Sequence, residues 1–160
     1  MWEQSLRLSY PQNVRFACSK CGLCCGDTVQ KKRHILLLET DVQQIAIYTR
    51  QLVNLFAAKT DGKEPYIYEM HKSRETGKCV FLQNNQCTVY EARPLICRFY
   101  PFELTTAENG EPCFRVTFEC PGVASPGTPK RGGKTLGESH FRSLLRLAYG
   151  RHKQPVCGRE

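Results

Sequence analysis

The sequence lacks the features that would place the protein in a membrane or in the secretory pathway. Its 160 residues contain no apolar run of about eighteen residues, which a membrane-spanning helix requires. The N-terminal stretch MWEQSLRLSYPQNVRF has neither an apolar core region nor a small-residue cleavage site, which argues against a secretory signal. We therefore expect a cytoplasmic protein without a membrane partner.

The sequence also lacks the motifs that would identify an enzyme class. The stretch GTPKRGGKT at 127–135 is close to a phosphate-binding loop, but Thr128 stands where the pattern needs glycine. The four histidines lack ligand spacing, and neither a carboxylate cluster nor a Cys–His pair can be identified. Whether the protein is an enzyme is therefore left open by these residues.

Acidic residues are few, and the resulting positive charge is unevenly distributed. Lys and Arg number 23 against 15 Asp and Glu, which gives a formal net charge of +8. Residues 130–160 carry eight basic and two acidic side chains, so +6 of this charge lies there. Residues 1–129 therefore carry only +2. Metal-bound cysteines are thiolates, so a divalent zinc ion on four of them has a net charge of −2, and residues 1–129 would be neutral or acidic with the metal bound. We expect a solvated basic end; contact with nucleic acid or an acidic partner is the alternative.

Cysteine is in excess, with ten residues, four of them in 18-CSKCGLCC-25. In a reducing compartment, clustered thiols hold metal more often than they form disulfides, although a disulfide framework is an alternative. The spacing C-x2-C-x2-C opens the bacterial ferredoxin run, in which thiolates hold a [4Fe–4S] cluster. Zinc is the rival, because C-x2-C pairs are a usual source of its thiolate ligands. The spacing therefore predicts a metal centre without fixing the metal.

We predict eight metal ligands from separate parts of the chain. They are Cys18, Cys21, Cys24, Cys25, Cys79, Cys87, Cys97 and Cys120. Eight thiols could form two four-ligand sites, or one site with spare or catalytic thiols, and both arrangements stay open. Adjacent side chains rarely converge from a regular backbone, so Cys24 and Cys25 are expected to point to different partners. We expect Cys113 to point outward and Cys157 to be free, with His71 as an alternative ligand.

Two arginines flank one of the predicted ligands. Arg93 and Arg98 lie on either side of Cys97 in 93-RPLICR-98. They could donate hydrogen bonds to thiolates and offset the negative charge of a metal site. The alternative is an ordinary salt bridge to Glu91 or Glu103.

The patterning predicts an α+β protein, a small single domain with short hairpins and two main helices organised around a cysteine–metal centre. Strands are expected at 34–38 and 66–70, hairpins at 79–90 and 102–120, and helices at 39–59, 93–102 and 136–149. Thr40 and Gln43 are expected to form a capping box at the start of the first helix, and Gly150 to stop the last one.

In the second hairpin, the two-residue alternation of a strand places Phe118 and Cys120 on the apolar face.

We assign residues 1–122 to a cysteine-cluster metal-binding domain. Residues 123–160 are assigned to a Pro/Gly loop, an amphipathic helix and a basic tail that pack on the same domain.

The order of these motifs resembles the CxxCxxCC cysteine-cluster family, also called the YkgJ-like or zinc- or iron-chelating domain family. The matching residues are 18-CSKCGLCC-25, then 79-CVFLQNNQC-87 with 88-TVYEARPLICRFYPF-102, then Cys120. The resemblance implies a small cytosolic protein that binds an iron–sulfur cluster or zinc through these cysteines. A related region occurs in flagellin lysine N-methylases, but this sequence carries no S-adenosylmethionine-binding glycine motif.

Our leading hypothesis is a metal-binding protein whose site is a [4Fe–4S] cluster, used for electron transfer or in support of another enzyme, with a redox or other protein partner. The first alternative is a structural zinc-binding interaction module. The second is the catalytic subunit of a protein-modifying, methylase-like enzyme.

Overall fold

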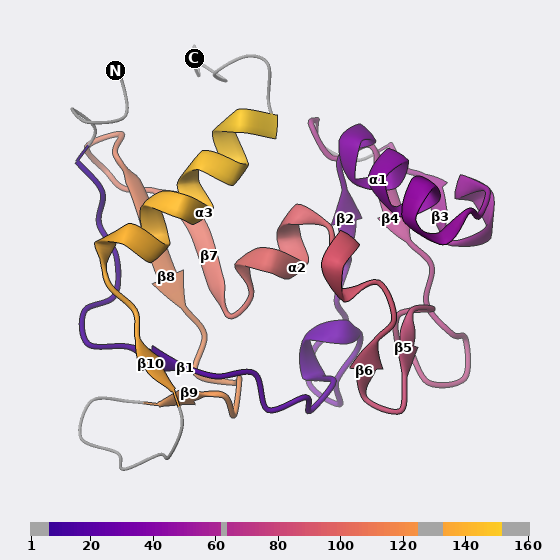
Figure 1. The fold of residues 1–160 in the computed structure, drawn as a ribbon, viewed down its shortest axis with the longest axis horizontal. Helices are drawn as coiled ribbons and strands as arrows, with labels where there is room; N and C mark the ends of the chain where they lie inside the picture. The colour runs from indigo at the N-terminus through magenta and orange to yellow at the C-terminus, as the bar shows by residue number, and fades with distance from the viewer. Residues whose placement is uncertain (1–6, 62–63, 125–132, 152–160) are drawn as a thin grey trace. The chain divides into compact units, whose positions relative to one another are not determined.

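The computed structural model describes residues 7–61, 64–124 and 133–151, and the chain divides into two compact units. The central unit is Lys20–Tyr100, and the terminal unit combines Met1–Ser19 with Pro101–Glu160. Helices alternate with short antiparallel strands along the chain (Figure 1). The predicted α+β class, with short hairpins and two main helices, is therefore confirmed. The assignment of 1–122 and 123–160 stays a prediction.

The central unit consists of short elements joined by tight turns. Its helices are α1 (Glu39–Thr49) and α2 (Leu95–Phe99), and its 3-10 turns are Leu23–Cys25, Val53–Leu55 and Tyr90–Ala92. Its strands are β2 (Leu36–Leu37), β3 (Ala57–Lys59), β4 (Tyr68–Met70), β5 (Leu82–Gln83) and β6 (Gln86–Cys87). Strand β4 lies between β2 and β3, whereas β5 and β6 form a hairpin of their own. The strands expected at 34–38 and 66–70 are thus confirmed.

A buried carboxylate fixes the start of α1. Asp41 is 1% exposed. Its carboxylate accepts hydrogen bonds from the backbone N–H groups of Leu38, at 3.1 Å, and of Leu95, at 3.1 Å. Leu38 directly precedes α1, and Leu95 is the first residue of α2. The side chain of Asp41 therefore accepts from a backbone N–H at the start of each helix, where no carbonyl within the helix is available. The predicted capping box of Thr40 and Gln43 is wrong.

The first helix is shorter than the predicted 39–59. It ends at Thr49, because Arg50 adopts a left-handed conformation with φ 56°. Beyond a 3-10 turn, the chain becomes β3 and pairs with β4 through Ala57, Ala58 and Lys59. These residues favour a helix by intrinsic propensity, but the backbone pairing with β4 prevails.

The hairpin predicted at 79–90 is confirmed and leads into the short second helix. Asn84 and Asn85 connect β5 to β6 with φ 49° and 59°. Two successive left-handed residues form the turn that matches the twist of a two-residue hairpin, and asparagine tolerates this conformation. Pro94 then precedes α2, as expected for a residue that has no backbone N–H to donate.

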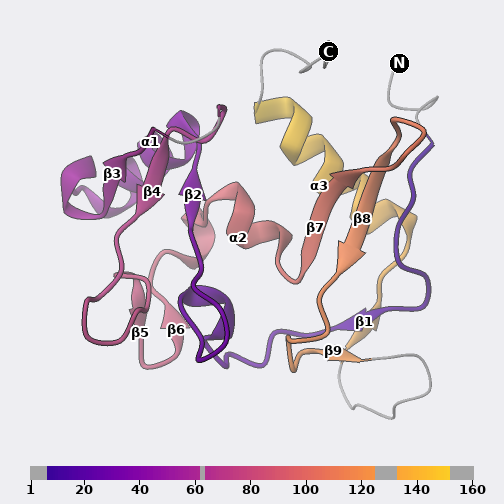
Figure 2. The same ribbon diagram turned by 180° about the vertical axis from the view of Figure 1, so that it is seen from behind.

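The terminal unit packs one helix against a hairpin. Its helix is α3 (Glu138–Arg151), and its strands are β1 (Arg15–Phe16), β7 (Phe102–Thr106), β8 (Pro112–Val116), β9 (Val123–Ala124) and β10 (Lys134–Thr135). Helix α3 lies along the β7–β8 hairpin, and Figure 2 shows the same packing from behind. The ring of Phe141 lies 5.0 Å from that of Phe102 and 5.3 Å from that of Phe114. Strand β1 lies between β10 and β9.

Two sequence predictions in the terminal unit need correction. Strand β8 ends at Val116, so the period-two pattern stops there and Phe118 is 59% exposed instead of buried. Cys120 is nevertheless buried, as predicted. Gly150 does not stop α3, which continues to Arg151. The apolar face predicted for this helix is confirmed, since Phe141 is fully buried together with three residues that follow it: Leu144, Leu145 and Ala148.

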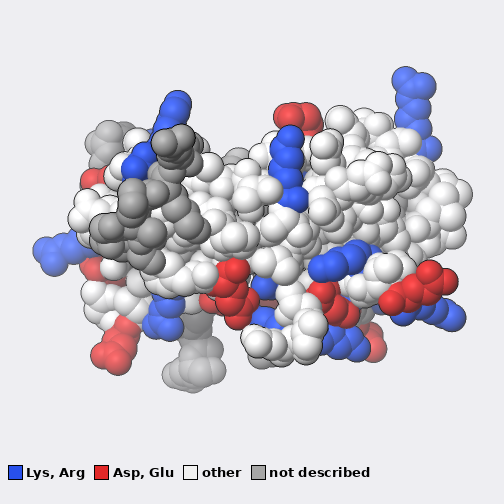
Figure 3. All heavy atoms as spheres, turned by 90° about the horizontal axis from the view of Figure 1, so that it is seen from below, with Lys and Arg blue, Asp and Glu red and all other residues white. Residues whose placement is uncertain are grey.

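No helix among the described residues is long and apolar enough to cross a membrane. On the face drawn in Figure 3, acidic side chains lie among basic ones. Much of the basic C-terminal end, including Lys130, Arg131, Lys153 and Arg159, lies outside the described residues, as does Cys157. The expected solvated basic end and free Cys157 therefore stay predictions.

Candidate metal centre

The turn that carries Cys24 and Cys25 is shaped by two glycines. Gly22 precedes the 3-10 turn with φ 72°, and Gly26 follows it with φ 150°. Between them, the Sγ atoms of Cys24 and Cys25 lie 3.7 Å apart, close enough to share a thiol hydrogen bond. The expectation that these neighbours point to different partners stays a prediction, although the turn brings their sulfurs side by side.

Three further thiols come from the hairpin and from α2. The backbone N–H of Cys79 donates to the carbonyl of Cys25 at 2.7 Å, which joins the hairpin segment to the turn. Cys87 closes β6 opposite Leu82. Cys97 lies in the middle of α2. We call these five residues the thiol cluster: Cys24, Cys25, Cys79, Cys87 and Cys97.

Electrostatic effects link the five thiols to one another. The thiol of Cys24 acts on the pKa values of all four others. Burial raises the pKa of Cys97, and the nearby thiols of Cys79 and Cys24 raise it further. Burial likewise raises the pKa of Cys79 to about 11, and it raises that of Cys87. These thiols hold their protons near neutral pH unless a cation replaces them.

The adjacent pair behaves differently from the other three thiols. The hydrogen bond from Cys25 lowers the pKa of Cys24 to about 6. The same bond, together with burial, raises the pKa of Cys25. A hydrogen bond donated by Cys25 thus favours the thiolate form of Cys24.

Arginine side chains bring positive charge to the cluster. Against the effect of burial, Arg93 favours the thiolate forms of Cys87 and Cys97, and it acts in the same direction on Cys24. Its Nε donates to the carbonyl of Tyr90 at 2.9 Å, and its guanidinium lies 3.6 Å from the centre of the Tyr90 ring. This supports the predicted charge-offsetting role, whereas direct hydrogen bonds to thiolates stay a prediction.

Arg98 supports the same turn from the other side of Cys97. It donates from Nε to the carbonyl of Arg93 at 2.8 Å and from Nη2 to that of Glu91 at 3.0 Å. These bonds satisfy carbonyl groups at the end of the Tyr90–Ala92 turn. Arg98 therefore contributes to the position of Arg93.

An ionic clamp holds the Cys24–Cys25 turn against the segment that precedes Cys79. Asp27 accepts a hydrogen bond from Lys72 Nζ at 2.6 Å and from the backbone N–H of Arg33 at 2.8 Å. Lys72 Nζ also donates to the carbonyl of Arg33 at 2.7 Å. Lys78 Nζ donates to the carbonyl of Asp27 at 3.0 Å. Together these contacts cross-link residues 27–33 to residues 72–78.

The other three predicted ligands are not among the five residues of the thiol cluster. Cys21 belongs to the central unit and is exposed. Cys18 and Cys120 belong to the terminal unit, where the N–H of Ala17 donates to the carbonyl of Gly122 at 3.1 Å and so brings their backbones near each other. Cys113 is half-buried in β8. All nine described cysteines are free thiols, so no disulfide joins any two of them.

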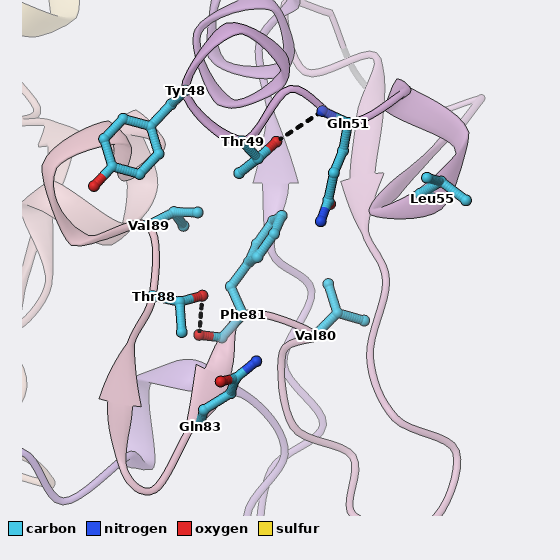
Figure 4. Close-up of a pocket in the computed structure, with 9 residues that line it drawn as sticks. All are labelled: Tyr48, Thr49, Gln51, Leu55, Val80, Phe81, Gln83, Thr88 and Val89. Atoms are coloured by element: carbon cyan, nitrogen blue, oxygen red, sulfur yellow. Dashed lines mark hydrogen bonds between the residues drawn. The ribbon is translucent and has the colours of Figure 1, made fainter.

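A pocket of about 500 Å³ opens on the central unit beside the β5–β6 hairpin (Figure 4). Its lining is Tyr48, Thr49, Gln51, Leu55, Val80, Phe81, Gln83, Thr88 and Val89, none of which is charged. Thr88 Oγ1 donates to the carbonyl of Phe81 at 3.1 Å across the hairpin. Cys79 and Cys87 pack against the same core as Phe81. One hairpin therefore carries two cluster sulfurs and one wall of this pocket.

Comparison with known proteins identifies the kind of domain that carries these cysteines. Residues 17–114 match the CxxCxxCC family, whose description is "Putative zinc- or iron-chelating domain". The chain belongs to this family. The resemblance stated from the motifs is thus confirmed, and membership in a chelating family supports metal binding through the cysteines. The match covers all five residues of the thiol cluster and ends before Cys120.

One relative of this chelating domain is an archaeal protein. Uncharacterized protein MJ0661 of Methanocaldococcus jannaschii is 32% identical over 109 residues, which make up 64% of this chain and 52% of that protein. The chain thus spans about half the length of this relative. No solved structure matches the chain.

The donor set of the chelating domain fits zinc or iron in its chemistry. Among the described residues, no three Cys, His, Asp or Glu side chains are already arranged to hold one ion. Thiolate sulfur is nevertheless the preferred donor for zinc and for iron–sulfur clusters. The cluster offers five such donors on one compact unit, with arginine charge beside them. In the chemistry of its donors, the cluster therefore fits either metal.

Sequence reasoning missed the residues that hold the thiols in place. Asp27, Lys72 and Lys78 form the clamp, and Asp41 ties α1 to α2. The only local signal was Gly26-Asp27 directly after the cysteine pair. Lys72 gives no comparable signal, because a lysine 45 residues away in the chain shows nothing of its partner.

Proposed function

We propose that the thiol cluster of the central unit holds a [4Fe–4S] cluster, which serves electron transfer or supports another enzyme. The observation that carries this proposal is the gathering of five thiols from a turn, a hairpin and a helix on one compact unit. Burial disfavours ionisation of Cys79, Cys87 and Cys97. A bound metal core would supply the positive charge that these thiols need in order to lose their protons.

Nearby backbone donors support thiolate ligation. The N–H of Phe81 lies 3.5 Å from Cys79 Sγ, and a backbone hydrogen bond from Val89 favours the thiolate of Cys87 against the effect of burial. Hydrogen bonds to cluster sulfurs are one of the means by which a protein sets the reduction potential of an iron–sulfur centre. The hairpin would thus both supply ligands and tune them.

Zinc is the second candidate, because the family description names zinc beside iron. A zinc ion would take four of the thiolates in a tetrahedral site and stabilise the fold without redox chemistry. Cys18, Cys21 and Cys120 stay predicted ligands under either metal.

The test is metal and sulfide analysis of protein purified without oxygen. We expect about four iron and four acid-labile sulfide per chain, with a broad visible absorption that dithionite bleaches. Cys97→Ser should lose iron and colour, whereas Cys113→Ser, outside the predicted ligand set, should keep both. Colourless protein that contains only zinc would replace the first candidate with the second. Protein that binds neither metal would reject both.

A further inference from the structure

Exposed apolar side chains gather on one part of the central unit. Six of them come from two segments, 47–58 and 79–90, and are between 38% and 80% exposed: Ile47, Tyr48, Leu52, Leu55, Val80 and Tyr90. Elsewhere among the described residues, only Val29 and Phe118 are large, apolar and similarly exposed. Single residues of this kind are normal on a protein surface, whereas a gathering of them marks an interaction site.

The pocket beside the β5–β6 hairpin joins the two segments into one surface. Tyr48 and Leu55 line it from the first segment (Figure 4). Val80 and Val89 line it from the second segment. The other three exposed residues each directly adjoin a lining residue in the chain: Ile47, Leu52 and Tyr90. We call the six exposed residues around this pocket the apolar patch.

The charge in and next to the apolar patch is mainly positive. The two segments contain a single charged residue, Arg50, although Asp, Glu, Lys and Arg make up 24% of the whole chain. Arg50 is exposed, lies between the lining residues Thr49 and Gln51, and forms no ion pair with a described residue. The charged residues that directly flank the segments are two lysines and one glutamate: Lys59, Lys78 and Glu91. An unpaired cation beside apolar surface favours a partner that carries a carboxylate.

The composition of the apolar patch is that of the centre of a protein–protein interface. Such centres are enriched in tyrosine and arginine and depleted in Lys, Glu and Asp. The patch presents Tyr48 and Tyr90, and the guanidinium of Arg93 lies 3.6 Å from the centre of the Tyr90 ring. A second copy of this chain fits less well, because a symmetric pair would set two equally positive surfaces against each other.

We propose that the apolar patch is the docking surface for a partner protein, which inserts a large apolar side chain into the pocket and places a carboxylate against Arg50. The inference goes beyond the proposed function, because the surface is the same whichever metal is bound. Val80 and Thr88 directly follow Cys79 and Cys87 in the chain. A partner held at the patch therefore contacts the segment that supplies two thiols of the cluster.

The test selects peptides that bind the full chain, purified without oxygen so that it keeps its metal. The probe is a phage-displayed library of random linear peptides without cysteine. We expect the selected peptides to combine large apolar residues with Asp or Glu. Fluorescence anisotropy of the labelled peptides should show that Leu55→Asp and Arg50→Glu each weaken binding about tenfold. Val29→Asp is the matched control and should bind as the wild type does, because Val29 is exposed on the same unit but outside the patch.

A charge reversal tests the role of Arg50 without depending on a loss of binding. Selected peptides in which Lys replaces Asp and Glu should bind Arg50→Glu more tightly than they bind the wild type. A misfolded variant would not give this recovery. Selected peptides that bind Leu55→Asp and Arg50→Glu as tightly as the wild type would overturn the proposal. A library that yields no binding peptide would also overturn it.

Other occupants of the apolar patch would give different results. Dimerisation of the wild type that Leu55→Asp abolishes, measured by sedimentation velocity, would assign the patch to a second copy of the chain and overturn the proposal. Binding to phosphatidylglycerol vesicles that Leu55→Asp abolishes would assign it to a membrane surface and overturn the proposal as well. The metal content of each preparation is measured separately, so a failure of the proposed function is distinguished from a failure of docking.

Discussion

At the scale of single residues, Gly26 shows how closely the cysteine turn approaches its neighbour. A Cβ atom placed on Gly26 would lie 2.7 Å from Lys78 Cα, and closer still to the carbonyl oxygen of Gly77. Its φ of 150° lies outside the range that other residues adopt readily. The glycine directly after Cys24-Cys25 is thus required by the contact with residues 77 and 78.

We expect Gly26→Ala to lower the free energy of unfolding by about 2–4 kcal/mol, since backbone atoms must move and strain is added. Chemical denaturation measures the change. Gly137→Ala is the control, because nothing lies within 4 Å of a Cβ at that position. Equal stability of the two variants would show that the turn does not approach residues 77 and 78 as described.

The lowered pKa of Asp27 predicts that the stability of the protein depends on pH. The hydrogen bond from Lys72 and that from the Arg33 amide hold the pKa of Asp27 below its ordinary value of 3.8. A depressed carboxyl pKa contributes stability above the ordinary value, and this contribution is lost as the pH falls through the lower folded pKa. Asp27→Asn should therefore be less stable than the wild type at neutral pH, with a gap that closes as the solution is acidified below about pH 4.

The measurement for Asp27 is urea denaturation of both proteins over a series of pH values. Glu75→Gln is a suitable control, since Glu75 is exposed and lies in the same segment as Lys72. A gap between wild type and Asp27→Asn that stays constant down to acid pH would contradict the assigned ion pair.

At the scale of elements, the local sequence pattern was sufficient to predict the hairpins, but not to predict where α1 ends. The Asn84-Asn85 turn and the Asn109-Gly110 turn are both local signals, and both connect strands in the structure. The stretch 50–59 carries helical spacing, yet it pairs with β4 in part, and Leu52 is 72% exposed. Strand pairing between distant segments is a tertiary effect that a local pattern does not contain.

Asp41 links two elements, and its removal should affect both. We expect Asp41→Ala to lower the free energy of unfolding by about 2–5 kcal/mol, because the buried N–H groups of Leu38 and Leu95 would each lose a charged acceptor. Thermal denaturation checks this, with Glu39→Ala as the control. Glu39 lies in the same first turn of α1 but is exposed. A loss no greater than that of Glu39→Ala would contradict the linking role.

At the scale of the whole molecule, the sequence predicted that cysteines form the site, but not how these cysteines are distributed between the two compact units. The spacing of Cys24, Cys79, Cys87 and Cys97 indicated a metal centre, and the structure places these four on the central unit. Cys18 lies in the terminal unit although it is only three residues from Cys21. A spacing motif reports neighbours along the chain, whereas the boundary at Ser19 depends on pairing of β1 with the distant β9 and β10.

Metal binding should therefore stabilise the two units unequally. A metal at about a thousand times its Kd adds about 4 kcal/mol to the unit that binds it. Hydrogen exchange of the chain, with and without Zn²⁺, should show slower exchange around Cys25, the β5–β6 hairpin and α2. Helix α3 should change little, because Phe141 and its neighbours pack on the β7–β8 hairpin within the terminal unit. Cys97→Ser serves as the control, in which Zn²⁺ should leave every segment unchanged. Equal protection of α3 and α2 in the wild type would show that the thiol cluster is not where the metal acts.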